Sequence, residues 1–219
     1  MPLQKKTQPQ KTKRTSKRTP KVLSVLLDFT VDCLRCMRPV AISAVEPSAR
    51  CRSCLYELEL EESLFRGSAV GCVRSAIDGE GGRSSHFDGD FTFVSRTRVL
   101  DPTCPGCGAG IDAPALVEAA HVCACGVTLG VRPSDDLVRA IHRNAAAIAG
   151  ERPRVELEAV EPVAFACPRC KASLVTDRTS RSVECAACSG FVDVPELLWN
   201  TLHPASPRPA IFLLLQGGR

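Results

Sequence analysis

Twelve of the thirteen cysteines in this 219-residue chain fall into six close pairs, five spaced Cys-x2-Cys and one spaced Cys-x-Cys. The pairs form three successive couples, whose inner gaps are 14, 15 and 14 residues. Four thiolates on two tight turns can surround one metal ion, and Zn²⁺ is the ion that such a set most often holds. The sequence therefore predicts three zinc ions per chain. The three ligand sets are Cys33, Cys36, Cys51 and Cys54; Cys104, Cys107, Cys123 and Cys125; and Cys167, Cys170, Cys185 and Cys188.

The coupling of neighbouring pairs is an interpretation, because six pairs could also be interleaved. Closing a longer loop costs more entropy, and the gaps between couples far exceed those within them. Disulfides are the second alternative, but they belong to oxidising compartments and the sequence shows no secretory signal pattern. We therefore expect reduced, metal-bound cysteines in a cytoplasmic protein. No stretch approaches the about 20 apolar residues of a membrane span.

Glycines support the interpretation of the pairs as tight turns. Gly108 follows Cys107 and Gly126 follows Cys125, where a positive φ would let backbone N–H groups reach the sulfurs. The first set has Met37 and Leu55 at these places, and the second contains the shortened Cys-x-Cys pair. We therefore expect any distortion in the first or the second site.

The cysteine sets define an internal repeat. Their first cysteines lie 71 and 63 residues apart, and each set spans 22 residues. Because so short a segment cannot bury a sufficient core, metal binding must supply much of its folding free energy. With one Trp and one Tyr, the composition also favours small metal-stabilised units over a single large core.

Apolar alternation predicts a strand before each set, over residues 22–31, 90–100 and 155–165. Helix-start signals at Pro133–Asp136 and at Pro195 predict short helices after the second and third sets. We expect six segments: a disordered basic tail (1–21), unit 1 (22–66), a Gly/Ser-rich linker (67–89), unit 2 with its helix (90–149), a hinge (150–154), and unit 3 with its helix and a C-terminal strand (155–219).

Charge is distributed unevenly along the chain. The basic tail holds eight cations and no acid, whereas the rest has 20 Lys and Arg against 24 Asp and Glu. Three zinc–tetrathiolate sites would make the body more negative still, so it is a poor general polyanion binder. The tail is either a solvated segment or an arm that contacts nucleic acid or an acidic partner. Its cations are Lys5, Lys6, Lys11, Lys13, Arg14, Lys17, Arg18 and Lys21.

Four other side chains have mainly structural interpretations. Cys72 is the unpaired thiol and is expected to be a small buried residue. His142 and His203 recur at matched helix ends, where we expect them to cap rather than to bind metal. Trp199 is expected to pack against its own unit, or to anchor a partner if it is exposed.

The segment Phe165-Ala166-Cys167-Pro168-Arg169-Cys170, with Cys185-Ala186-Ala187-Cys188 and Val192–Pro195, resembles the zinc-ribbon superfamily. The resemblance implies two β-hairpin knuckles holding one Zn²⁺. It gives the expected fold class: a small metal-stabilised α+β protein with three tandem zinc ribbons, a strand before each, and short helices after the second and third.

The resemblance is nearly silent on function. A non-enzymatic adaptor that binds a protein partner is the favoured hypothesis. A nucleic-acid-associated factor that uses the basic tail is the alternative. An enzyme is disfavoured, because a zinc ion with four sulfur ligands lacks an open position for catalysis. We expect no membrane association and no small-molecule substrate.

Overall fold

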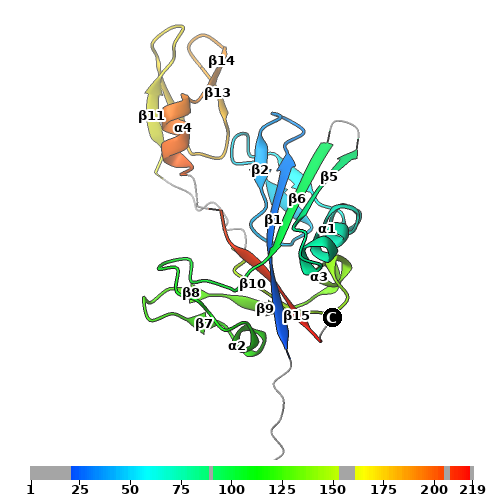
Figure 1. The fold of residues 1–219 in the computed structure, drawn as a ribbon. Coiled ribbons are helices and arrows are strands. Elements are labelled where there is room, and N and C mark those ends of the chain that lie inside the picture. The colour runs from blue at the N-terminus through cyan, green and yellow to red at the C-terminus, as the bar shows by residue number, and fades with distance from the viewer. Residues whose placement is uncertain (1–20, 89–90, 153–160, 205–207, 218–219) are drawn as a thin grey trace, which may run out of the picture.

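The computed structural model describes residues 21–88, 91–152, 161–204 and 208–217. The basic tail, apart from Lys21, lies outside these residues, as does the end of the chain. One antiparallel sheet dominates the fold (Figure 1), in the order β5-β6-β1-β15-β10-β9 with β2 paired to β1. Its strands are β1 (Val22–Asp32), β2 (Pro39–Ala41), β5 (Gly82–Asp88), β6 (Phe91–Val99), β9 (Val131–Pro133), β10 (Ala145–Ala149) and β15 (Ile211–Gln216).

The C-terminal strand β15 lies in the middle of this sheet, between β1 and β10. Its sequence, Ile-Phe-Leu-Leu-Leu-Gln, is apolar at five consecutive positions, and all five side chains are buried. A strand covered on both faces needs such a continuous apolar run. Ile211, Leu213 and Leu215 enter one hydrophobic cluster, and Phe212 and Leu214 enter another, so successive side chains serve opposite faces.

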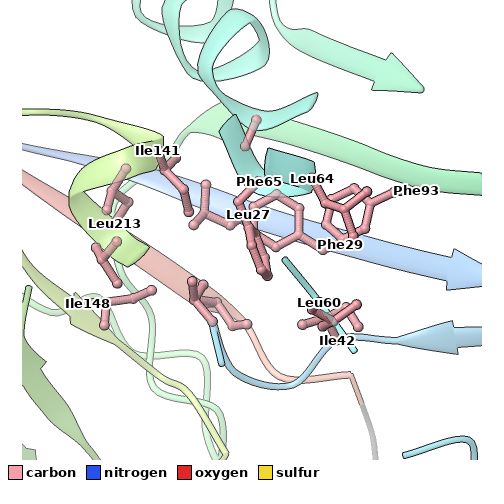
Figure 2. Packing of buried hydrophobic residues seen from close by; sticks show 14 of the residues in the cluster. Leu27, Phe29, Ile42, Leu60, Leu64, Phe65, Phe93, Ile141, Ile148 and Leu213 are labelled. Atoms are coloured by element: carbon pink, nitrogen blue, oxygen red, sulfur yellow. The ribbon is translucent and has the colours of Figure 1, made fainter. Parts of the chain in front are cut away.

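Helices α1 (Glu62–Ile77) and α3 (Asp136–Ile141) pack against each other on the face of the sheet that carries Ile211, Leu213 and Leu215. The aromatic rings of Phe29, Phe65 and Phe93 meet there, with centroids 5.4 to 5.7 Å apart. Figure 2 shows this cluster between α1 and the sheet. Helix α2 (Ala113–Glu118) contacts strands of the sheet and contributes to the second cluster.

The third cysteine set forms a separate small body that is inserted in sequence between β10 and β15. It consists of two hairpins and helix α4 (Glu196–Leu202), and Figure 1 shows it standing away from the main sheet. Its own cluster includes Cys167, Leu174, Cys185 and Val192. The strands of the hairpins are β11 (Val163–Ala166), β12 (Ser173–Thr176), β13 (Ser182–Glu184) and β14 (Phe191–Asp193).

The coarse fold class is confirmed: the chain is α+β, mostly strands with few short helices, and it carries three four-cysteine clusters. The strands before the first two sets and the helices after the second and third sets lie where the sequence places them. Of the strand expected over 155–165, residues 155–160 lie outside the described part. No helix in the described ranges is long and apolar enough to cross a bilayer.

The linker predicted over residues 67–89 is wrong. Its residues form most of α1 and all of β5, and β5 pairs with β6 along seven residues. The helix forms despite Gly67 and Gly71, since Phe65, Ala69, Val73 and Ala76 line one buried stripe. Gly82, which appeared to mark a loop, instead allows β5 to approach α1, where a Cβ would clash with the Cys72 carbonyl.

The prediction that the C-terminal strand belongs to unit 3 is also wrong. The strand pairs with β1 and β10 of the main sheet. Units 1 and 2 are therefore not tandem independent modules, because they share one sheet and β15 completes the core of both. Among the residues that the structure describes, only the third set has a cluster made entirely of its own residues.

Candidate metal centres

Each cysteine pair lies on a tight turn closed by a short antiparallel pairing. The first pairs are closed by β1–β2, by the Thr103–Gly110 bridge and by β11–β12. The second pairs are closed by β3 (Ser48–Arg50) with β4 (Glu57–Glu59), by β7 (His121–Val122) with β8 (Thr128–Leu129), and by β13–β14. The six turns are thus one local structure used repeatedly.

The residue after the second cysteine has a positive φ in all six turns. Glycine fills this position only in the second set, as Gly108 and Gly126. Met37, Leu55, Lys171 and Ser189 adopt the same left-handed conformation at φ values of 50° to 65°. Such a conformation costs a non-glycine residue about 1–2 kcal/mol, so the contacts of the turn must offset that cost. The missing glycines of the first set therefore do not prevent the turn.

The turns bring the cysteines together in the three predicted sets. Within each set all four sulfurs lie within 4.8 Å of one another. The closest Sγ–Sγ distances between the two pairs of a set are 3.5 to 3.9 Å. These distances exceed the about 2.05 Å of a disulfide bond, and every cysteine is a free thiol. The arrangement is compatible with one metal ion per set, and the interleaved and disulfide alternatives do not match it.

The first cysteine of each pair is buried, whereas the second is half-buried in site 1 and exposed in sites 2 and 3. Site 1 is the most enclosed: Cys33 and Cys51 are buried in the main cluster, and Cys36 and Cys54 pack against it. Site 2 joins the opposite cluster through Cys104 and Cys123. The sulfur atoms are thus part of the cores, and a metal ion bound to them would hold those cores together.

Hydrogen bonds shift the thiol pKa values in opposite directions within a site. Backbone N–H groups of Cys107 and Gly106 donate to Cys104 and lower its pKa to about 6. The Val127 N–H favours the thiolate of Cys125, but hydrogen bonds with the neighbouring sulfurs, first that of Cys104, outweigh it and raise the pKa of Cys125 to about 12. One sulfur thus ionises readily while another retains its proton. A cation between them would favour the thiolate form of all four.

Unit 3 contacts the second turn of site 1 through α4. The indole Nε1 of Trp199 donates to the Arg52 carbonyl oxygen at 3.1 Å, and Arg52 Nε donates to the His203 carbonyl oxygen at 2.5 Å. Glu196 bridges Arg38 of the first turn, at 3.3 Å, and Arg181 of its own unit, at 2.6 Å. Arg52 lies between the cysteines of one pair, so the site 1 turn is itself the docking surface.

Trp199 is 1% exposed. Its ring stacks on His203 with a centroid distance of 3.9 Å, and the Arg181 guanidinium lies 5.0 Å from the ring centroid. The expectation that Trp199 packs against its own unit is therefore incomplete, because its one hydrogen-bond donor serves unit 1. Sequence reasoning missed this role, since no local pattern links residue 199 to residue 52.

Both matched histidines lie at helix ends, as predicted. His203 is buried, its two ring nitrogens lie 3.1 Å from the carbonyl oxygens of Trp199 and Arg178, and burial lowers its pKa. His142 ends α3 and accepts a hydrogen bond from the Asn144 N–H. Neither belongs to a four-sulfur group.

Cys72 is buried on α1, and its Sγ lies 3.6 Å from the Ser95 carbonyl oxygen. Its thiol pKa is raised by burial, which makes it a poor nucleophile near neutral pH.

Of the eight tail cations proposed to contact nucleic acid or an acidic partner, only Lys21 is described, and it is exposed. The other seven lie outside the described residues.

Comparison with protein-family models, with curated proteins and with solved structures finds no match for this chain. Its function must therefore be argued from its own residues.

Proposed function

We propose that the chain is a non-enzymatic zinc-binding adaptor whose three zinc-ribbon-like units form a rigid scaffold for a protein partner. One observation carries the proposal: every site offers four sulfurs, and the first cysteine of each pair is buried within a hydrophobic cluster. A metal ion so placed would stabilise the structure, and its coordination would already be complete without a substrate or water.

Zinc is the proposed metal because of the ligand type and the spacing of the sulfurs. A regular tetrahedron with Zn–S bonds of about 2.3 Å has sulfurs about 3.8 Å apart, close to the 3.5 to 3.9 Å measured between the two pairs of each set. The proposed ligands are the twelve paired cysteines, namely Cys33, Cys36, Cys51, Cys54, Cys104, Cys107, Cys123, Cys125, Cys167, Cys170, Cys185 and Cys188. Thiolates of this kind persist in a reducing compartment, which supports a cytoplasmic location.

The zinc-ribbon assignment is supported by the six short pairings that close the six turns. Unit 3 fits it best, with two complete hairpins, β11–β12 and β13–β14, around one set of sulfurs. Unit 2 departs from it, because helix α2 lies between its two cysteine pairs.

The adaptor proposal is tested by purifying the tagged full-length protein after nuclease treatment. We expect three Zn²⁺ per chain by native mass spectrometry, together with a protein partner in stoichiometric amount. The ion count and the partner are separate results: fewer than three ions would contradict the metal assignment, and a purified chain that binds no protein would contradict the adaptor.

The second candidate is a nucleic-acid-associated factor, favoured by the eight cations of residues 1–21. Its test is a salt titration of RNA and duplex DNA binding, comparing the natural chain with a variant in which all eight cations are Gln. Binding that persists in the variant would assign nucleic-acid contact to the body. Binding that disappears would assign it to the tail, and absence of binding in both would reject this candidate.

A further inference from the structure

An open cavity of about 1040 Å³ lies where α1, α3 and the adjoining ends of β1, β6 and β15 meet. Figure 1 shows α1, α3 and the end of β15 together on this side of the sheet. None of the cysteine ligands lines it. The cavity is therefore a feature separate from the metal centres, and we call it the basic cavity.

The wall of the basic cavity combines apolar and cationic side chains. Leu23, Val70 and Ile77 are half-buried apolar residues among its lining. Four exposed cations surround them, namely Lys21, Arg74, Arg139 and Arg143. Among the described lining residues there is no Asp or Glu.

The cations differ in how far neighbouring groups neutralise them. Arg139 lies 3.5 Å from Asp136, and Arg74 lies in the last turn of α1, where it compensates the negative end of the helix dipole. Lys21 and Arg143 make no ion pair with any residue that the structure describes. The positive potential reaches His142, whose pKa is lowered by burial and by the charges of Arg143 and Arg74.

We propose that the basic cavity binds an acidic, amphipathic peptide segment of a protein partner, with its apolar side chains on Leu23, Val70 and Ile77 and its carboxylates on Lys21 and Arg143. Charge complementarity selects an anionic occupant, because the rim is cationic in a body that is otherwise acidic. The aliphatic floor favours apolar side chains over bases: apart from His142, no aromatic residue in the described lining offers a stacking surface. The inference rests on the proposed adaptor function and names the partner's chemistry.

The full-length, metal-loaded protein is titrated into a short fluorescein-labelled peptide composed of Glu and Leu, and anisotropy is measured. We expect Lys21→Gln with Arg143→Gln to weaken binding roughly tenfold, because two charged contacts are lost. The matched control is Arg83→Gln with Arg98→Gln, which removes the same charge. Arg98 is next to the cavity-lining Val99 on β6, so its side chain points to the opposite face of the sheet. Arg96 lies two residues from Arg98 and shares that face, and Arg83 is the cross-strand partner of Arg96. Both control residues therefore face away from the basic cavity.

Two further probes separate the alternatives. A peptide with Ser in place of Leu should bind roughly tenfold more weakly, since it cannot use the apolar floor. If it binds as tightly as the Glu/Leu peptide, the floor has no role and the inference fails. If labelled oligothymidylate binds more tightly than the Glu/Leu peptide and loses that affinity in the Lys21/Arg143 variant, the cavity is a nucleic-acid site and the inference is overturned.

The outcome also distinguishes the cavity from the adaptor function itself. Residues 1–20, with the other seven cations of the tail, are unchanged in all variants, so their contribution cancels in the comparison. A natural protein partner that binds the Lys21/Arg143 variant as tightly as the unmodified chain would overturn the cavity proposal and leave the adaptor function intact. No binding of the Glu/Leu peptide to the unmodified protein would overturn it as well.

Discussion

Loss of metal at site 1 should release unit 3, and Trp199 should report it. The indole–carbonyl hydrogen bond to Arg52 contributes about 1 kcal/mol and the Arg52 guanidinium bond to His203 about 2 kcal/mol. The exposed Arg38–Glu196 pair adds at most about 1 kcal/mol. A total of about 3–4 kcal/mol corresponds to a docked-to-undocked ratio of roughly 10² to 10³. All three contacts use the two turns that a site 1 metal would hold in place.

The perturbation is Cys54→Ser, which removes one half-buried sulfur of site 1, and the matched control is Cys125→Ser at the corresponding place in site 2. Trp199 is the only Trp in the chain, so its emission is specific to this contact. We expect a red shift in Cys54→Ser, as the buried indole becomes hydrated, and an unchanged maximum in Cys125→Ser.

Arg52→Ala provides a graded test, because it keeps the carbonyl that accepts from Trp199. Losing about 2 kcal/mol lowers the docked ratio roughly thirtyfold, which leaves most molecules docked and the emission maximum nearly unchanged until mild denaturant is added. An unshifted maximum in Cys54→Ser, or an equal shift in Cys125→Ser, would refute the coupling of site 1 to unit 3.

Three further results are expected. Gly108→Ala should weaken metal binding at site 2 by about 1 kcal/mol, measured by chelator competition. The reason is the φ of +75° at Gly108, because no atom lies near the added methyl group. The control Gly110→Ala is equally open but has no positive φ, so its metal affinity should be unchanged. Cys72→Ser should keep three metal ions by native mass spectrometry, and loss of one would show that the ligand sets are wrong. Gly82→Ala should lower the free energy of unfolding by about 1–3 kcal/mol in a urea titration, because its Cβ would clash with the Cys72 carbonyl; a stability equal to that of the unmodified chain would contradict the tight approach of β5 to α1.

The three four-cysteine clusters were predictable from the sequence because each depends on local structure. A cysteine pair closes one turn, and two turns within about 15 residues are brought together by short hairpins. The left-handed residue after each pair was only partly predictable, since glycine marks it in the second set but Met37, Leu55, Lys171 and Ser189 adopt it elsewhere. There the closure of the turn overrides the preference of the residue.

The linker error shows where local signals fail. Glycines and serines over residues 67–89 indicate a loop when each is considered alone. In the structure Gly82 allows close packing, and buried Ser68 and Ser95 lie 2.7 Å apart, oxygen to oxygen, between α1 and β6. These small residues are used for close approach, which depends on a neighbour far away in sequence.

The sequence alone establishes the three four-cysteine sets, the strands before the first two of them, the short helices after the second and third, and the concentration of cations at the N-terminus. How the units combine depends on long-range contacts. The run Ile211–Leu215 is compatible with any buried strand, yet pairing with β1 and β10 places it between two cores. The contact of Trp199 with Arg52 and the convergence of Lys21 and Arg143 on one cavity likewise join residues more than 100 positions apart. Such pairings depend on complementary buried surfaces and long-range strand register, which no local pattern in the chain encodes.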